Sequence, residues 1–206
     1  MKKNIISILL IILGITLILA SLSIKVYSKN KESQLIDNFN SRLNAEKNER
    51  ELIEHKHGED ESNKKEVKIG DEISTIEIPS INLKSVIVEG IGKDQLRYAL
   101  GHFKDTAMPG EYGNFSVAGH SSSIYKEILN NLYKVEIGDE IILKTLKGKF
   151  EYKITDKFVV EPTEINVLEQ DKNKKNITIV TCTDGGEKRL IIKGEYKEII
   201  KTPKKL

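Results

Sequence analysis

The chain has 206 residues, which is enough for one ordinary domain with accessory segments. Its 33 Lys and Arg residues nearly balance 31 Asp and Glu residues, so the formal net charge of +2 provides no general attraction to nucleic acid. Trp is absent and aromatic residues are sparse, which leaves no evident surface for stacking bases. We therefore expect no nucleic-acid partner.

The first predicted element is an apolar helix. Residues 5–24 form a stretch of 20 residues without a charge, rich in Ile and Leu. A helix of that length spans roughly 30 Å, the hydrocarbon thickness of a bilayer. Lys2 and Lys3 resemble the start of a cleavable signal peptide, but the apolar run exceeds the usual h-region of about 7–15 residues. We expect residues 1–28 to be a retained transmembrane anchor. Because only four residues precede the apolar stretch, we expect the remainder of the chain to lie outside the cell.

Residues 29–68 form a charged region with 9 basic and 10 acidic side chains. Such a composition buries too little apolar surface to offset the entropy lost on ordering, so we interpret the region as a stalk between membrane and domain. Apolar residues at helical spacing favour a short amphipathic helix in its first half: Leu35, Ile36, Phe39 and Leu43.

The second half of this region, residues 55–66, has the composition of a disordered spacer. It contains His55 and His57, which are two residues apart and therefore do not share a helix face. We interpret both histidines as solvated residues and not as a metal site.

From about Ile69 the chain changes to short runs rich in Ile, Val, Thr and Tyr, separated by Gly or Pro. Their composition and spacing predict strands and an all-β barrel or sandwich, with one or two short helices within 93–100 and 124–132. The predicted strands are 74–78, 85–89, 114–118, 140–144, 151–158, 177–182 and 189–197. We assign residues 69–200 to one β domain and residues 201–206 to a basic tail.

Three residues at predicted strand ends have side chains that are suited to catalysis. Cys182 is the single cysteine of the chain and ends the run Thr178-Ile-Val-Thr-Cys182. His120 ends the run Val117-Ala-Gly-His120, and Arg189 begins the strand after Cys182. A strand end places a side chain on a rigid support with its tip at the barrel rim. An exported chain with one cysteine forms no internal disulfide, so this thiol is a candidate nucleophile.

The order of these residues resembles the sequence pattern of the sortase family. The Thr-x-x-Thr-Cys run, an earlier Gly-His and a later Arg form the core of the resemblance, which extends over about residues 70–200. The run from Ile76 to Leu83 is similar to the family's first strand, and residues 107–114 are similar to the segment before its histidine. The resemblance implies an eight-stranded sortase-type β-barrel behind an N-terminal transmembrane helix.

The same resemblance implies a reaction and its partners. Cys182 is expected to attack the Thr carbonyl of an LPxTG-like C-terminal sorting signal, cleave before Gly and form a thioacyl intermediate. His120 is expected to carry the proton, and Arg189 to support the oxyanion or the substrate backbone, with Thr181 as a further candidate donor. The protein would then pass to an amine of the cell wall, such as a peptidoglycan precursor. The resemblance also implies that the protein lies in the cell membrane of a Gram-positive type envelope.

Several alternatives stay open. His102, which also follows a Gly, is a second candidate base, and Arg97 is a second candidate guanidinium. A membrane-tethered thiol peptidase that releases its product into water would use the same cysteine and histidine. The chain could also be a non-enzymatic β-barrel binding module, in which case the match of three residues to the sortase pattern is a coincidence.

Shorter segments bear on the class of sortase that the chain resembles and on its need for a cofactor. No hydrophobic C-terminal stretch and no Asp-Pro-aromatic lid are visible, and residues 161–175 are too few for the extra helix of class B. The compact loop 183–188 favours class D, with class A as second choice. No cofactor is expected. A calcium requirement stays open, because the loop carboxylates have no coordinating spacing: Asp105, Glu161, Glu164 and Asp171.

Overall fold

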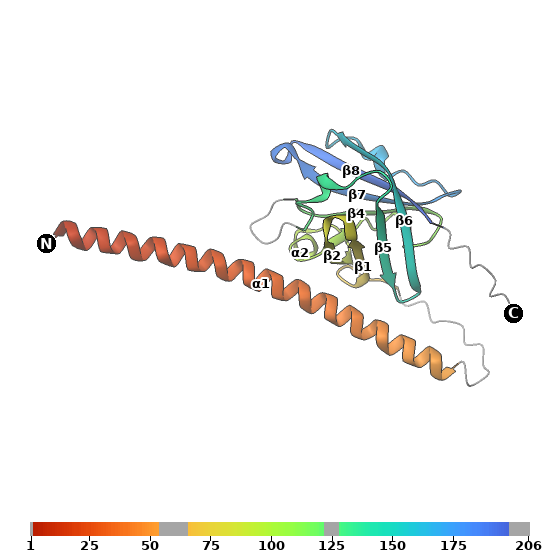
Figure 1. Ribbon diagram of the computed structural model, residues 1–206, viewed down its shortest axis with the longest axis horizontal. Helices are drawn as coiled ribbons and strands as arrows, with labels where there is room; N and C mark the ends of the chain where they lie inside the picture. The colour runs from red at the N-terminus through yellow and green to blue at the C-terminus, as the bar shows by residue number, and fades with distance from the viewer. Residues whose placement is uncertain (1, 54–65, 122–127, 198–206) are drawn as a thin grey trace.

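A computed structural model of the chain describes residues 2–53, 66–121 and 128–197 (Figure 1). Its main feature is a closed β-barrel of eight strands, preceded by one long helix, α1 (Lys2–Ile53). The strands are β1 (Glu72–Ile78), β2 (Leu83–Glu89), β3 (Leu100–His102), β4 (Gly113–Ala118), β5 (Glu140–Thr145), β6 (Gly148–Val160), β7 (Lys175–Thr183) and β8 (Lys188–Tyr196). The predicted barrel with few short helices behind an apolar N-terminal helix is confirmed.

The strands close in the order β1-β2-β3-β4-β7-β8-β6-β5. β2 pairs parallel with β3 and β4 pairs parallel with β7, while the other pairs are antiparallel. A parallel pair requires a crossover, and the short helix α2 (Lys93–Leu96) lies in the one between β2 and β3. Because β7 enters between β4 and β8, residues far apart in the chain meet on neighbouring strands.

All seven predicted strands are confirmed, and the strand that the sequence analysis missed is β3. Its three residues, Leu-Gly-His, lack the β-branched run that marks the other strands. The helix predicted over 93–100 is confirmed for α2 only. Of the helix predicted over 124–132, residues 124–127 lie outside the described residues, and the following part is a turn that leads into a 3-10 turn (Leu132–Lys134).

The barrel interior is filled mainly by aliphatic side chains that alternate along the strands, together with Phe115 and Tyr152. On β7, Ile177 and Ile179 are buried in the main apolar cluster, together with Val117 of β4 and Leu190 of β8. Side chains of the opposite parity on β4, β7 and β8 therefore face outward. This alternation places Cys182 outside the core and on the outer face of the sheet.

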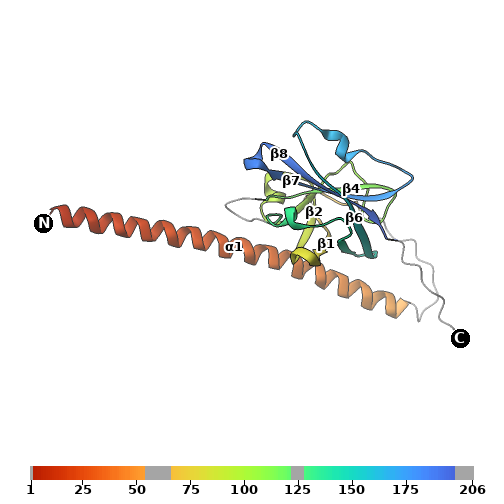
Figure 2. The same ribbon diagram turned by 45° about the horizontal axis from the view of Figure 1, so that its top comes forward.

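Helix α1 has two parts with different surroundings. Its first part is apolar and exposed: the Ile and Leu side chains between residues 6 and 24 are between 41% and 63% exposed. By length and composition this part of α1 is the segment of the described chain that qualifies as a membrane span. In both views it extends away from the barrel (Figures 1 and 2).

The later part of α1 lies against the barrel next to β1 and β2 (Figure 2). Phe39 is fully buried, and Leu35 and Ile36 pack against an apolar cluster made of Val86, Val88 and Ala99. Two polar contacts accompany this packing. The Ser85 hydroxyl donates to Glu32 Oε1 at 2.8 Å, and Arg42 Nη1 pairs with Glu72 Oε2 at 2.9 Å.

Residues 29–53, which we interpreted as the start of a stalk, are thus helical and continuous with the apolar segment. The amphipathic helix predicted from the spacing of their apolar residues is present, and the apolar face of this helix packs on the barrel. The predicted spacer with His55 and His57, apart from its last residue, and the predicted basic tail lie outside the described residues. The domain boundaries at residues 28, 68 and 200 stay predictions.

Candidate active site

The three predicted site residues lie in one row across three neighbouring strands. The parallel register of β4 and β7 ends at Ala118↔Val180, so two residues further along lie His120 and Cys182. On the other side of β7, Cys182 is directly opposite Arg189 of β8. Neighbouring strands are about 4.8 Å apart, so the imidazole, thiol and guanidinium start from adjacent backbone positions. We call His120, Cys182 and Arg189 the three-strand row.

Hydrogen bonds between the ends of β4 and β7 hold His120 beside Cys182. The amide of Gly119 donates to the Val180 carbonyl at 3.1 Å, and the Thr181 hydroxyl donates to the Gly119 carbonyl at 2.8 Å. One residue after His120, the Ser121 hydroxyl donates to the Cys182 carbonyl at 2.6 Å. The parallel alignment therefore continues past the last strand pair, and the histidine backbone is fixed on both sides.

Gly119 fills a position where a side chain does not fit. A Cβ there would lie 2.3 Å from Leu100 Cδ2 and 2.9 Å from Leu129 Cδ1, both of which are buried core atoms. The glycine lets the end of β4 approach the core closely before the chain turns outward at His120. The Gly-His dipeptide is thus explained by packing as well as by chemistry.

Arg189 is half-buried and its guanidinium is turned toward its own loop. Nη1 donates to the Gly186 carbonyl at 2.8 Å and to the Lys188 carbonyl at 3.1 Å. The loop is compact because Gly185 and Gly186 have φ values of +67° and +102°, which residues with a Cβ rarely adopt. Both hydrogen bonds use Nη1, and a guanidinium carries five N–H donors in all.

Cys182 is half-buried and borders a hollow of about 470 Å³. The walls of this hollow come from Ser121, from Asn130 and Tyr133 in the segment before β5, and from Gly185 and Gly186. The thiol is therefore accessible and does not have the enclosed environment of a packing cysteine.

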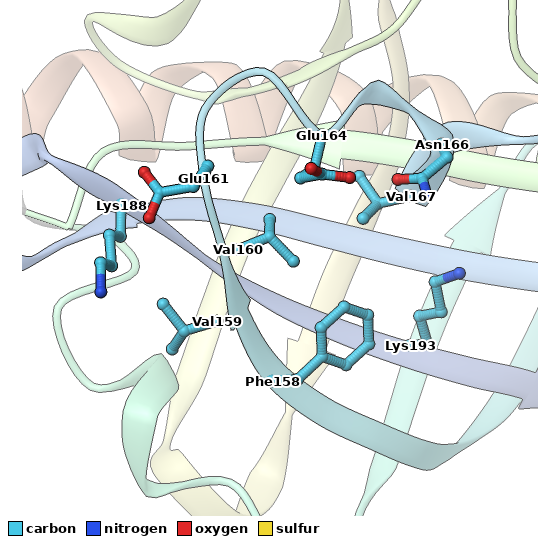
Figure 3. Close-up of a pocket in the computed structure, with 9 residues that line it drawn as sticks. All are labelled: Phe158, Val159, Val160, Glu161, Glu164, Asn166, Val167, Lys188 and Lys193. Carbon is cyan, nitrogen blue, oxygen red and sulfur yellow. The ribbon is translucent and has the colours of Figure 1, made fainter.

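A second hollow of about 430 Å³ lies between the end of β6, the loop that follows it and β8 (Figure 3). Phe158 and Val160 at the end of β6 form its apolar floor, and Val160 is directly opposite Arg189 in the strand register. The loop between β6 and β7 arches over it and contributes Glu164, Asn166 and Val167. Two lysines of β8, Lys188 and Lys193, lie at opposite ends of the hollow (Figure 3).

His102, the alternative base, is in a different environment from His120. Its side chain is 1% exposed, Nδ1 lies 2.9 Å from Glu89 Oε2, and Nε2 lies 2.9 Å from the Thr106 hydroxyl. The ring also stacks on Phe115 with the two centroids 5.0 Å apart. Both ring nitrogens have partners and solvent does not reach them, so His102 is positioned as a structural residue.

The other two candidates are also separate from the row. Arg97 follows α2, and its guanidinium lies over the Tyr98 ring at 6.0 Å from the centroid. Thr181 is buried and its hydroxyl donates to Gly119, so it positions the histidine segment. The sequence analysis missed Ser121 as a positioning residue, although its place directly after His120 was a signal for it.

No group of three or more His, Cys, Asp or Glu side chains that could hold a metal ion occurs within the described parts of the chain. Among the four loop carboxylates considered for calcium, Asp171 accepts a hydrogen bond from the Asn173 amide at 2.9 Å within its own turn.

Comparison with known proteins gives consistent results. A family model described as "Sortase domain" matches residues 76–197. "Sortase D" of Bacillus subtilis is 30% identical over 125 residues, which are 58% of this chain and 61% of that protein. "Sortase A" of Listeria monocytogenes is 27% identical over 136 residues, which are 65% of this chain and 60% of that protein. The match thus spans about 60% of the length of these curated relatives.

Among solved structures, a Clostridium perfringens Sortase D5 transpeptidase is similar with a TM-score of 0.68 and 39% identity. This match covers 81% of the present chain and 98% of that chain. A lid mutant of Sortase A from Corynebacterium diphtheriae has a TM-score of 0.60 at 27% identity, and covers 67% and 75% of the two chains.

Proposed function

The chain belongs to the sortase family, and on this premise we propose that it is a membrane-tethered cysteine transpeptidase. The observation that carries the proposal is the three-strand row, in which Cys182 lies between His120 and Arg189. We propose that its substrates are exported proteins with an LPxTG-like sorting signal and that an amine of the cell wall accepts them. The 39% identity to a Sortase D5 favours class D over class A.

The proposed reaction has two half-reactions that share one nucleophile. The Cys182 thiolate attacks the Thr carbonyl carbon, and the resulting tetrahedral oxyanion collapses with cleavage of the Thr–Gly amide bond. His120 gives a proton to the departing amine of Gly, which leaves a thioester on Cys182. The acceptor amine then loses a proton to His120 and attacks the thioester, which forms a new amide bond and releases the thiolate.

Arg189 is the proposed donor to the oxyanion. Its backbone lies opposite Cys182, and we propose that its guanidinium rotates away from the Gly186 carbonyl to donate to the oxyanion oxygen. Because loss of one such donor costs roughly two to three decades in rate, we expect that order of loss in Arg189→Ala.

We assign the two hollows to the two substrates of the reaction. The apolar floor made by Phe158 and Val160 fits the apolar start of a sorting signal, so we assign the donor peptide to that hollow. The hollow that Cys182 itself borders is then the approach for the acceptor amine. The exposed apolar part of α1 serves as the anchor, with the barrel on the outer side of the membrane.

The test is intact-mass analysis of the chain after incubation with an LPxTG-like peptide, with and without an amine acceptor. We expect an acyl adduct on the wild-type chain and none on Cys182→Ala, followed by an aminolysis product when acceptor is present. Hydrolysed peptide alone across a panel of cell-wall amines would favour the thiol peptidase. Absence of any adduct would favour the binding module.

The proposed reaction uses the thiol, imidazole and guanidinium and requires no cofactor. Turnover that persists in excess chelator is the expected result. Loss of turnover that calcium restores would place a cation in the mechanism.

A further inference from the structure

The loop between β6 and β7, residues 161–174, forms one wall of the hollow assigned to the donor peptide. It includes a 3-10 turn, η3 (Ile165–Leu168), and most of its side chains are exposed, Ile165 to 77%. A loop with so few buried side chains has little apolar packing to fix its position. Its backbone is held instead by polar side chains that the reaction does not use.

The edge of β4 is where the loop is attached. β3 pairs with β4 only at Gly101↔Ala118 and His102↔Val117, so the start of β4 extends beyond its neighbour. Backbone N–H and C=O groups on such an edge need other partners. Ser116 exchanges hydrogen bonds with the Phe103 amide and the Thr106 hydroxyl, whereas both backbone groups of Asn114 are paired with the side chain of Gln170.

The Gln170 carboxamide makes four hydrogen bonds. Oε1 accepts from the amides of Asn114 at 2.9 Å and Ala107 at 3.1 Å. Nε2 donates to the carbonyls of Asn114 at 3.0 Å and Leu168 at 2.8 Å. These bonds use both donors and two acceptor positions of the carboxamide, so a single side chain joins β4, the β3–β4 connection and the loop.

The side chain of Asn114 in turn binds the backbone of the loop that carries Gln170. It is 3% exposed, and its Nδ2 donates to the loop carbonyls of Val167 at 3.2 Å and Glu169 at 3.3 Å. Its Oδ1 accepts from the Thr178 hydroxyl of β7 at 2.8 Å. Each carboxamide therefore binds the backbone of the other segment, and the two sets of bonds act in parallel.

The neighbouring Gly113 fits this arrangement. Its φ is +128°, and a Cβ at this position would lie 2.7 Å from Gln170 Oε1 and 2.7 Å from the Ala107 methyl group. The start of β4 thus leaves room for Gln170, which a residue with a side chain would displace.

We propose that Asn114 and Gln170 form a carboxamide clamp that sets the position of loop 161–174 and thereby the affinity for the donor peptide. The clamp lies six residues before His120, which is about 20 Å along an extended strand, so these are positioning residues and not catalytic ones. Their effect reaches the peptide through Val167, which lines the hollow and whose carbonyl the clamp holds. This inference rests on the proposed function.

The experiment compares Gln170→Ala and Gln170→Glu with Asn173→Ala, a matched control that removes an exposed carboxamide from the same loop. Glu keeps the shape and the acceptors of Gln but replaces both N–H donors by carboxylate oxygen, which repels the carbonyls of Asn114 and Leu168. Three readouts are taken: backbone hydrogen exchange of residues 161–174, the melting temperature, and kcat and KM with an LPxTG-like peptide.

We expect both Gln170 variants to raise KM about tenfold with kcat within about threefold, and to speed exchange in the loop. The melting temperature should change little, because Gln170 lies at the surface. The control should match the wild-type chain in all three. An unchanged KM despite faster exchange, an unchanged exchange pattern, or an equal rise of KM in Asn173→Ala would overturn the proposal. An inactive wild-type chain would overturn the proposed function and its effect on KM, while hydrogen exchange would still decide whether the clamp holds the loop.

Discussion

The two sides of the barrel use the same dipeptide in opposite ways. On the β2–β3 side, His102 follows Gly101 and is 1% exposed, with Glu89 on one ring nitrogen and Thr106 on the other. On the β4–β7–β8 side, His120 follows Gly119 and is half-buried at the rim beside Cys182. A Gly-His pair at a strand end therefore has no fixed role, and the neighbouring strands decide it.

The difference extends beyond the two rings. The β2–β3 side also carries the cluster of Val86, Val88 and Ala99 on which α1 packs, so both of its faces are covered. On the β4–β7–β8 side, the described residues form two hollows, one bordered by Cys182 and the other by Val160, which is directly opposite Arg189. We expect substitutions on the first side to change stability and substitutions in the three-strand row to change rate.

In the comparison of the two sides, the largest effect is expected for His120→Ala. Loss of the proton carrier should lower kcat/KM by about 10²–10⁴-fold, because general acid–base catalysis contributes that much. The melting temperature should stay near that of the wild-type chain. Kinetics with a sorting peptide and a thermal melt on the same sample check both statements. Near-normal rates here, together with an inactive but folded His102→Ala, would move the base to the β2–β3 side.

The next effect concerns the buried Glu89–His102 pair. His102→Ala leaves the Glu89 carboxyl buried without this partner, and its Oε1 already has no hydrogen-bond partner among the described residues. We expect the free energy of unfolding to fall by about 3 kcal/mol, with kcat/KM per folded molecule preserved. Denaturant unfolding of both single variants and of Glu89→Ala/His102→Ala gives the coupling between the residues. Strictly additive losses would mean that the pair does not act as a unit.

A smaller effect is expected where α1 meets the barrel. Phe39→Ala removes a fully buried side chain, and we expect a loss of about 3 kcal/mol at most, because the helix end can move to fill the space. Asn38→Ala, exposed on the same helix, is the control. Thermal melts in detergent and turnover of a soluble peptide are measured for both. Equal melting temperatures in the two variants would show that α1 does not stabilise the barrel.

The smallest effect is a high-pH transition in the core between the two sides. Burial raises the pKa of Tyr152 to about 12, against the weaker opposing effect of the Gly110 amide that donates to its hydroxyl at 2.8 Å. A raised pKa means that the neutral phenol is favoured in the fold. Its contribution to stability is complete below the usual phenol value of about 10 and is lost as the pH rises through about 12. Tyrosinate absorbance of the wild-type chain minus that of Tyr152→Phe should show this late titration, and a difference titration near pH 10 would contradict it.

Much of this protein follows from local sequence. Period-two alternation with β-branched residues predicts seven strands, because a strand buries every second side chain whatever its partner. A run of 20 uncharged residues predicts the apolar helix, because a helix of that length matches the thickness of a bilayer whatever the rest of the chain does. The order of His120, Cys182 and Arg189 at strand ends was visible as well, since strand ends are set by the same pattern.

Other features depend on segments far apart in the chain, and tertiary structure decided them. The short β3 forms because β2 and β4 offer it partners, and His102 is structural because Glu89 and Thr106 meet it there. The helical spacing of Leu35 and Ile36 predicted an apolar face on residues 29–53, but the surface that covers this face, made by Val86, Val88 and Ala99, was known only from the tertiary structure. Gln170 looks like an ordinary loop residue until β4 presents an unpaired edge to it. Local pattern determines which face of an element is apolar, whereas burial and hydrogen-bond partners are set by the neighbours that the closed barrel brings together.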